Sequence, residues 1–190
     1  MKILLIQIKM LGDVLTSTII LDTLRAAYPQ VQLHYLINPK SEAIVRNHPA
    51  VDQLHYFDDS NGNSLKNFSV MAKKLRNEQF DIVIDVYSKW FTALLSKYTA
   101  APMRIGQHKN YLAWLYSHTR RNQAQRPTAL PLAYSNRLQL LEPLNVKLPE
   151  NVQPKIFIHP EEQQAMTAIC REAGINFDSH LYVMVNLFGS

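Results

Sequence analysis

Cysteine is nearly absent from this chain, because Cys170 is the only one among 190 residues. No intramolecular disulfide can form, which fits a reducing compartment. No C-x-x-C pair occurs, and the 7 histidines lack the sequence spacing that is typical of metal ligands. The sequence therefore predicts neither a disulfide scaffold nor a metal site.

Long apolar runs are also missing. No stretch approaches the roughly 18 apolar residues that a membrane-spanning helix needs. The apolar start at Lys2–Ile8 resembles the opening of a signal peptide, but Gln7 and Lys9 break the run and no small-residue cleavage site follows. A buried first strand explains it better, and we expect a cytoplasmic protein.

Several signatures of nucleotide and metal chemistry do not occur. The chain has no G-x-G-x-x-G after its first apolar strand, no G-x-x-x-x-G-K-[ST], and no nucleophile elbow. No D-x-D motif is present, and the Asp58-Asp59 pair in a polar loop is a poor substitute. These absences weaken the dinucleotide-binding, P-loop and metal-diphosphate interpretations.

What is present suits a globular core with a basic surface. Apolar residues make up 47% of the chain and charged residues 18%, the formal charge is +5 and the pI is about 9.3. The excess of positive charge indicates either a solvated basic surface or an anionic partner. It does not choose among phosphorylated lipid, nucleotide and nucleic acid.

Apolar strands alternate with helical segments along the first 150 or so residues. This alternation predicts parallel βαβ units with right-handed crossovers, that is, an α/β fold with a Rossmann-like parallel sheet. We expect a basic, aromatic loop over 107–128 that contains a helix at 111–117. The predicted strands are 2–8, 32–37, 53–57, 81–86 and 103–106, and the predicted helices are 13–28, 41–47, 64–77, 89–98 and 131–141.

The organisation changes near Pro149. We expect residues 1–154 to form one domain and residues 155–190 to open a second. In the second part, the sequence predicts strands at 155–159 and 181–188 and a helix at 160–173 that ends at Gly174.

Ligands of open α/β sheets bind at the carboxyl ends of the strands. Lys9, Gly12 and Asp13 follow the first predicted strand, and Asp85 and Lys89 follow the fourth. Asp13 is either a helix-capping or first-turn acid or a general base that removes a proton from a sugar hydroxyl. Asp85 is either an acid that holds a loop at the strand end or a ligand-binding group.

Cationic and aromatic side chains follow the later strands. The basic residues are either plain surface charge or a rim that holds phosphate groups. The aromatic residues are expected in the core rather than on a sugar-stacking surface. The basic set is Lys89, Arg104, His108, Lys109, Arg120 and Arg121, and the aromatic set is Trp90, Tyr111, Trp114 and Tyr116.

Six motifs in order resemble glycosyltransferase family 9, the heptosyltransferase family. Each is moderately specific, but their order and spacing cover nearly the whole chain. They are Leu11-Gly12-Asp13-Val14-Leu15, Tyr28-Pro29, His48-Pro49-Ala50-Val51-Asp52, Phe80-Asp81-Ile82-Val83-Ile84-Asp85, Arg104-Ile105-Gly106 and Val185-Asn186-Leu187-Phe188-Gly189-Ser190.

The resemblance implies the N-terminal half of a GT-B enzyme, in which this half receives the acceptor and the C-terminal half binds a nucleotide-sugar, usually ADP-heptose. Transfer to a lipopolysaccharide core or similar saccharide would invert the anomeric centre, with Asp13 as the base and no cofactor or metal. It also implies peripheral contact with the inner membrane and no nucleic-acid partner. The expected acceptor-binding residues are Lys9, Gly12, Asp85, Lys89, Arg104, Lys109, Arg120 and Arg121.

The chain departs from the family pattern at several points. The family often has small residues where Lys9 and Met10 stand, and a Gln-Gly or Asn-Gly pair where Tyr87-Ser88 stands. Phe91 replaces a frequent basic residue, for which Lys89 can substitute. These departures favour a different acceptor pocket.

Residues 155–190 match only the start of the donor-binding domain. We therefore expect residues 1–190 alone to be inactive, and the apolar strand at 181–188 to pair with the same strand of another chain. The alternative is a non-catalytic α/β domain that binds an anionic ligand or a partner chain.

Overall fold

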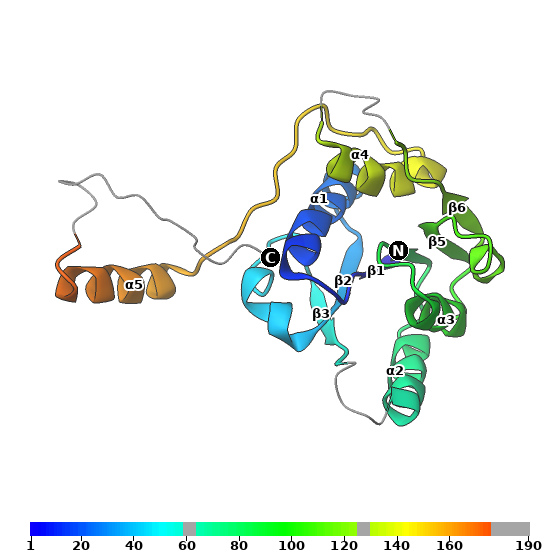
Figure 1. Cartoon of the computed structure of the whole chain (residues 1–190), viewed down its shortest axis with the longest axis horizontal. Helices are drawn as coiled ribbons and strands as arrows, with labels where there is room; N and C mark the ends of the chain where they lie inside the picture. The colour runs from blue at the N-terminus through cyan, green and yellow to red at the C-terminus, as the bar shows by residue number, and fades with distance from the viewer. Residues whose placement is uncertain (59–63, 125–129, 176–190) are drawn as a thin grey trace. The chain divides into compact units, whose positions relative to one another are not determined.

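The computed structural model describes residues 1–58, 64–124 and 130–175 (Figure 1). The chain divides into two compact units, Met1–Phe157 and Ile158–Ser190. The strand that the sequence predicts at 181–188 lies outside the described residues.

The first unit is built on a six-stranded sheet in the order β3-β2-β1-β4-β5-β6. Every neighbouring pair is parallel, which confirms the expected α/β, Rossmann-like fold. The chain runs outward from β1 to β3 and then resumes on the other side of β1 with β4, so the order reverses between β1 and β4. The strands are β1 (Lys2–Ile6), β2 (Gln32–Ile37), β3 (Gln53–Tyr56), β4 (Ile82–Asp85), β5 (Met103–Gln107) and β6 (His118–Arg120).

Helices connect the strands and cover both faces of the sheet (Figure 1). Apolar side chains at helical spacing drive this packing, because each helix buries one stripe against the strands. The α-helices are α1 (Leu11–Ala27), α2 (Ser64–Asn77), α3 (Trp90–Tyr98) and α4 (Leu132–Leu138), and the 3-10 helices are η1 (Pro39–Ile44), η2 (Ala113–Leu115) and η3 (Gln139–Leu144).

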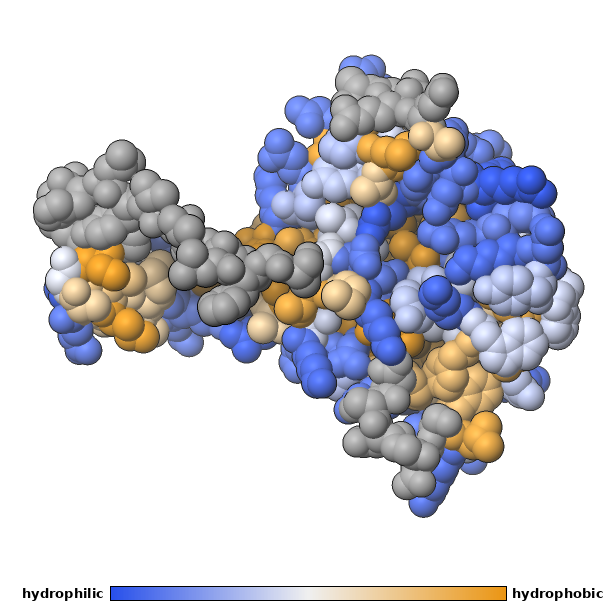
Figure 2. All heavy atoms as spheres, viewed as in Figure 1, coloured by the Kyte–Doolittle hydropathy of each residue, from blue (hydrophilic) through white to orange (hydrophobic). Residues whose placement is uncertain are grey.

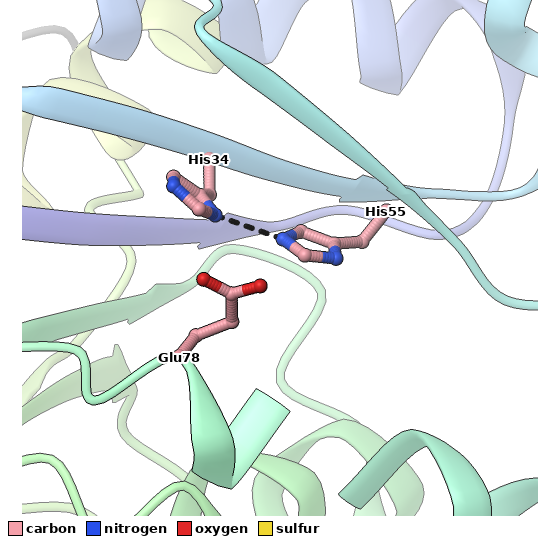
Figure 3. A group of neighbouring side chains, drawn as sticks. All are labelled: His34, His55 and Glu78. Carbon is pink, nitrogen blue, oxygen red and sulfur yellow. Dashed lines mark hydrogen bonds between the residues drawn. The ribbon is translucent and has the colours of Figure 1, made fainter. Parts of the chain in front are cut away.

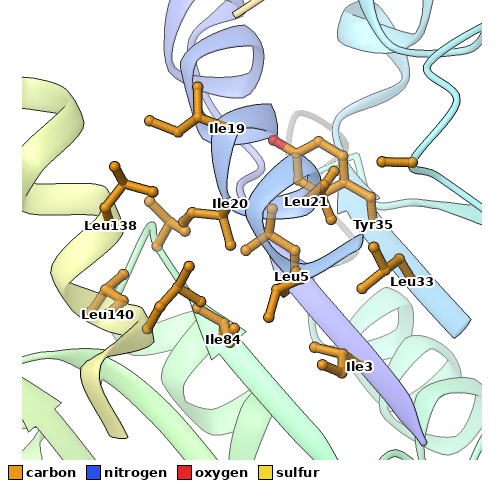
Figure 4. Packing of buried hydrophobic residues seen from close by; sticks show 14 of the residues in the cluster. Ile3, Leu5, Ile19, Ile20, Leu21, Leu33, Tyr35, Ile84, Leu138 and Leu140 are labelled. Carbon is orange, nitrogen blue, oxygen red and sulfur yellow. The ribbon is translucent and has the colours of Figure 1, made fainter. Parts of the chain in front are cut away.

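The core lies in two layers, one on each side of the sheet. Successive strand side chains point to opposite faces, so Ile3 and Leu5 of β1 join one apolar cluster and Leu4 and Ile6 the other. The first cluster packs strands against α1, α4 and η3 (Figure 4), and its labelled members include Ile20, Leu138 and Leu140. The second cluster packs the strands against α2 and α3 through Met71, Leu75 and Leu95.

Five elements differ from the sequence-based predictions, and one of them is the helix expected at 111–117, which is the shorter 3-10 helix η2. The strand β6 was not predicted, since His118-Thr119-Arg120 shows no apolar alternation. The helix expected at 41–47 is the 3-10 helix η1, which begins at Pro39 with the Asn38 side chain accepting from the Lys40 backbone N–H. The helix expected over 131–141 is α4 followed by η3, which contains Pro143 and ends at the left-handed Asn145.

The strand expected at 155–159 does not form. The run Ile156-Phe157-Ile158 is apolar, but the side chains of Ile156 and Ile158 are 50% and 60% exposed. An apolar segment without a neighbouring strand forms no ladder of hydrogen bonds, and this segment pairs with no strand of the described chain.

The second unit, taken by itself, contains α5 (Pro160–Glu172). Pro160 stands at the start of this helix, where its missing N–H costs nothing. Gly174 follows the helix with φ 73°, the left-handed conformation that glycine adopts readily, as the sequence predicted. None of the described helices in either unit has the length and apolarity needed to cross a bilayer.

Candidate functional site

A pocket of about 360 Å³ opens at the carboxyl edge of the sheet, where the strand order reverses. In open α/β sheets this is the place where ligands bind. The loops after β1, β4, β5 and β6 and one face of α4 contribute its walls. The lining residues are Gln7, Asp13, Val86, Tyr87, Lys89, Gln107, Lys109, Asn122, Ala133, Asn136 and Arg137.

Asp13 reaches this pocket from the first turn of α1. Its carboxylate oxygen Oδ1 accepts a hydrogen bond from Arg137 Nη2 at 2.5 Å, and Arg137 Nε donates to the Ser17 hydroxyl at 3.3 Å. Oδ2 makes no hydrogen bond within the described part of the chain. The guanidinium fixes one oxygen of Asp13 while the carboxylate remains 47% exposed, so the second oxygen can meet a ligand.

Arg137 was missed by the sequence analysis. It lies in α4, far along the chain from Asp13, and its side chain is only 13% exposed. The helix prediction at 131–141 placed it on an element, but no sequence signal paired that element with α1. The ion pair depends on the packing of α4 against α1.

Asp85 lies beneath the pocket rather than in its wall, because its side chain is fully buried. It accepts hydrogen bonds from the Ser88 backbone N–H at 2.8 Å and from the Tyr116 hydroxyl at 2.8 Å. Ser88 adopts a left-handed φ of 45°, and its hydroxyl accepts from the Gln107 N–H. Asp85 therefore ties the β4–α3 loop to β5 and to Tyr116, and it is not among the residues that line the pocket.

Burial raises the pKa of Asp85 from its usual value near 3.8 to about 6, against the opposing hydrogen bonds of Ser88 and Tyr116. The folded chain thus binds this proton more tightly than the unfolded chain. The contribution of Asp85 to stability is complete below about pH 4 and is lost as the pH rises to about 6.

This linkage gives a pH test. Between pH 4 and 7 the wild type is expected to lose about 2–3 kcal/mol of stability relative to Asp85→Asn, which cannot ionise. Urea unfolding of both proteins at each pH measures the difference, and every other titrating group cancels in the comparison. Parallel stability curves for the two proteins would show that Asp85 keeps its usual pKa.

Two lysines make the pocket electropositive. Lys109 Nζ donates to the Ser88 carbonyl at 2.5 Å, and Lys89 lines the same wall. Burial and, secondarily, the charge of Lys89 lower the pKa of Lys109. With Arg137, three cationic side chains face one exposed carboxylate, Asp13, so the pocket suits an anionic ligand.

The remaining predicted site residues do not line this pocket. Lys9 and Gly12 are exposed on the β1–α1 loop and the first turn of α1. Arg104 stands near the amino end of β5, where its guanidinium donates to the carbonyls of Ala101 and Leu115. Arg120 pairs with Glu142 at 2.7 Å, and Arg121 contacts His108 at 3.2 Å.

Figure 2 shows strongly hydrophilic residues gathered over β5 and β6 and less polar residues over α3 and α2.

The aromatic side chains differ from the prediction. Trp90, Tyr111 and Trp114 are 53%, 62% and 63% exposed, and only Tyr116 is buried. Leu112 and Leu115 fill the local core in their place.

A larger hollow of about 870 Å³ lies between α1 and residues 145–152. Its walls include Ala26, Ala27 and Leu148, and none of the strand ends reaches it. The smaller pocket is the candidate site because it combines the switch point of the sheet with converging charged groups.

Comparison with known proteins identifies the family of this chain. The family model described as glycosyltransferase family 9 (heptosyltransferase) matches residues 69–183, more than half of the chain. Lipopolysaccharide heptosyltransferase 3 of Escherichia coli K12 is 27% identical over 141 residues, which are 71% of this chain and 40% of that protein. Lipopolysaccharide heptosyltransferase 1 of Campylobacter coli is 24% identical over 65% of this chain and 35% of that protein.

Solved structures share the fold. The glycosyltransferase family 9 protein of Veillonella parvula superposes with a TM-score of 0.81 at 22% identity, over 93% of this chain and 50% of that chain. The Escherichia coli heptosyltransferase WaaC with ADP-2-deoxy-2-fluoro heptose gives a TM-score of 0.67 at 17% identity, over 82% and 51% of the two chains. The chain thus spans about two fifths of the length of these curated relatives and half of these solved chains, and it belongs to glycosyltransferase family 9, the heptosyltransferase family.

Proposed function

We propose that this chain is the acceptor-binding half of a GT-B glycosyltransferase, which moves a sugar from a nucleotide donor to an anionic saccharide. The family and its relatives support lipopolysaccharide core as the acceptor class and ADP-heptose as the donor class. The observation that carries the proposal is Asp13, held by Arg137 in an electropositive pocket at the switch point of the sheet.

In this proposal Asp13 is the general base. The acceptor hydroxyl donates to Oδ2 of Asp13, and its oxygen bonds to the anomeric carbon of the donor sugar as the bond to the diphosphate breaks. The proton passes to Asp13 and the electron pair leaves with the nucleotide diphosphate, so the anomeric centre inverts. Arg137 orients the carboxylate, which matters because a base must lie within hydrogen-bond reach of the proton it removes.

Lys89 and Lys109 bind the acceptor in this arrangement. Acidic or phosphorylated groups of a core saccharide would lie against the two ammonium groups, while the reacting hydroxyl lies at Asp13. Asp85 acts indirectly by positioning Lys109. Asp85 accepts a hydrogen bond from the Ser88 backbone N–H, and the Ser88 carbonyl accepts one from Lys109. The acceptor is lipid-linked, so the pocket would be used at the membrane surface.

Acceptor binding tests the proposal directly. Titration of the chain with a phosphorylated core saccharide, followed by calorimetry, is expected to show binding that weakens as salt rises. Lys89→Ala and Lys109→Ala should each lower the affinity about tenfold, the magnitude expected for a lost hydrogen bond to a charged group.

Lys66→Ala is the matched control, because Lys66 is an exposed residue of α2 outside the pocket. We also expect residues 1–190 to bind no ADP and to transfer no sugar without a donor-binding domain. The proposed function would be contradicted if the saccharide does not bind. It would also be contradicted if Lys89→Ala and Lys109→Ala both bind the saccharide with the affinity of the wild type.

A further inference from the structure

Two histidines and a glutamate meet on the α2 side of the sheet (Figure 3). His34 lies in β2, His55 lies in β3, and Glu78 follows the end of α2. One ligand-type atom of each residue lies within 4.8 Å of the other two. The sequence analysis expected no metal site, because the three residues come from separate elements and have no motif spacing.

Hydrogen bonding satisfies this cluster only in part. His34 Nδ1 and His55 Nε2 lie 2.8 Å apart, so the two rings share one hydrogen bond. The other nitrogen of His55, Nδ1, is buried and has no hydrogen-bond partner in the described chain. This Nδ1 atom lies on the ring edge turned away from His34, so Nε2 is the His55 nitrogen that faces the cluster (Figure 3).

We propose that His34, His55 and Glu78 form a binding site for a divalent transition metal of the Zn²⁺ type, with water as the fourth ligand. Two imidazoles and one carboxylate are a known ligand set for zinc. The ligand atoms of a tetrahedral zinc ion lie about 3.3–3.5 Å apart, given bond lengths of about 2.0–2.2 Å. The ligand-type atoms of the cluster lie within 4.8 Å of one another, so side-chain rotations would have to bring them to this spacing.

The surroundings favour ligation. His34 and His55 are 7% and 1% exposed, so the two imidazole ligands lie almost entirely out of solvent. Lys2 Nζ holds Glu78 Oε2 at 3.1 Å, which leaves Oε1 for a metal. A hydrogen-bond partner of this kind helps to fix the orientation of a metal-binding carboxylate.

The metal site is separate from the acceptor pocket, because none of its three residues lines that pocket. A bound ion would join β2 and β3 to the end of α2, so its expected effect is on stability. The proposal is also independent of the proposed function, and metal binding can be tested without any transfer assay.

Metal titration of the whole chain provides the test. After treatment with EDTA and buffer exchange, ZnCl₂ is expected to bind at one ion per chain in calorimetry and to raise the melting temperature, since only the folded state assembles the ligands. CoCl₂ in its place should give the visible absorption of a tetrahedral ion. Glu78→Gln should weaken Zn²⁺ binding by about tenfold or more.

Glu161→Gln and His118→Gln are matched controls, since both residues are exposed and lie outside the cluster. His34→Gln and His55→Gln should abolish the cobalt spectrum, with circular dichroism used to verify folding. Because Glu78 is part-exposed, its variant keeps the test valid if a histidine variant fails to fold. Absence of Zn²⁺ binding, or equal binding by wild type and Glu78→Gln, would overturn the proposal.

Discussion

Replacement of Asp13 by asparagine is expected to lower turnover by about 10²–10⁴-fold in a two-domain enzyme that contains this chain, the usual contribution of a general base. Asparagine keeps the size of the side chain but cannot take the proton from the acceptor hydroxyl. Acceptor affinity should change much less, because Lys89 and Lys109 remain in place. Initial rates at saturating acceptor, with calorimetry for affinity, separate the two effects.

Asp22→Asn is a matched control, since Asp22 lies on the same helix but outside the pocket. Arg137→Met is expected to slow turnover by a smaller factor, because it releases the carboxylate that Arg137 holds at 2.5 Å without removing it. If Asp13→Asn turns over sugar at nearly the wild-type rate, another group is the base.

Gly106→Ala is expected to destabilise the fold by about 3–5 kcal/mol. A Cβ at this position would lie 2.5 Å from the ring carbon Cζ of Tyr116, a distance at which the ring must move. Overpacking of this kind costs about 1–3 kcal/mol. Displacement of Tyr116 would also remove its hydrogen bond to the buried Asp85, which adds the cost of an unpaired polar group.

Urea unfolding measures this loss, and two further variants isolate its cause. Gly12→Ala should leave stability nearly unchanged, because a Cβ at Gly12 meets nothing within 4 Å. Tyr116→Leu removes the ring that causes the clash, so Gly106→Ala should cost much less in that background. Additive effects of the two substitutions would contradict a direct contact between Gly106 and Tyr116.

The sheet was the most predictable part of the molecule. Continuous apolar runs such as Lys2–Ile6 and Ile82–Asp85 are typical of strands buried on both faces, and both formed as expected. The polar strand β6 escaped prediction because its backbone is held by pairing with β5 rather than by side-chain burial. The apolar run Ile156-Phe157-Ile158 led to a wrong strand prediction for the opposite reason, because it has no neighbouring strand in the described sheet.

The residues of the candidate site were predictable only where they lie close to the end of a strand in the sequence. Asp13 stands in the first turn of the helix that follows the first strand. Ligands of open α/β sheets bind at the carboxyl ends of the strands, so this position alone predicted a site residue. Arg137 and Tyr116 act through contacts between distant elements, and neither belongs to a local motif. Arg104 shows that a motif can also mislead. It belongs to the Arg104-Ile105-Gly106 motif and was expected to bind the acceptor, but its guanidinium donates to main-chain carbonyls outside the pocket.

Both edges of the sheet are short and polar, which bears on the behaviour of the chain in solution. β3 and β6 comprise 4 and 3 residues, and they carry Gln53 at one edge and His118 and Arg120 at the other. An incoming strand would find few free backbone groups to pair with, and at β6 it would also have to desolvate the charged Arg120 side chain. The sheet is therefore protected against growth by strand addition, so aggregation of this domain should require partial unfolding first.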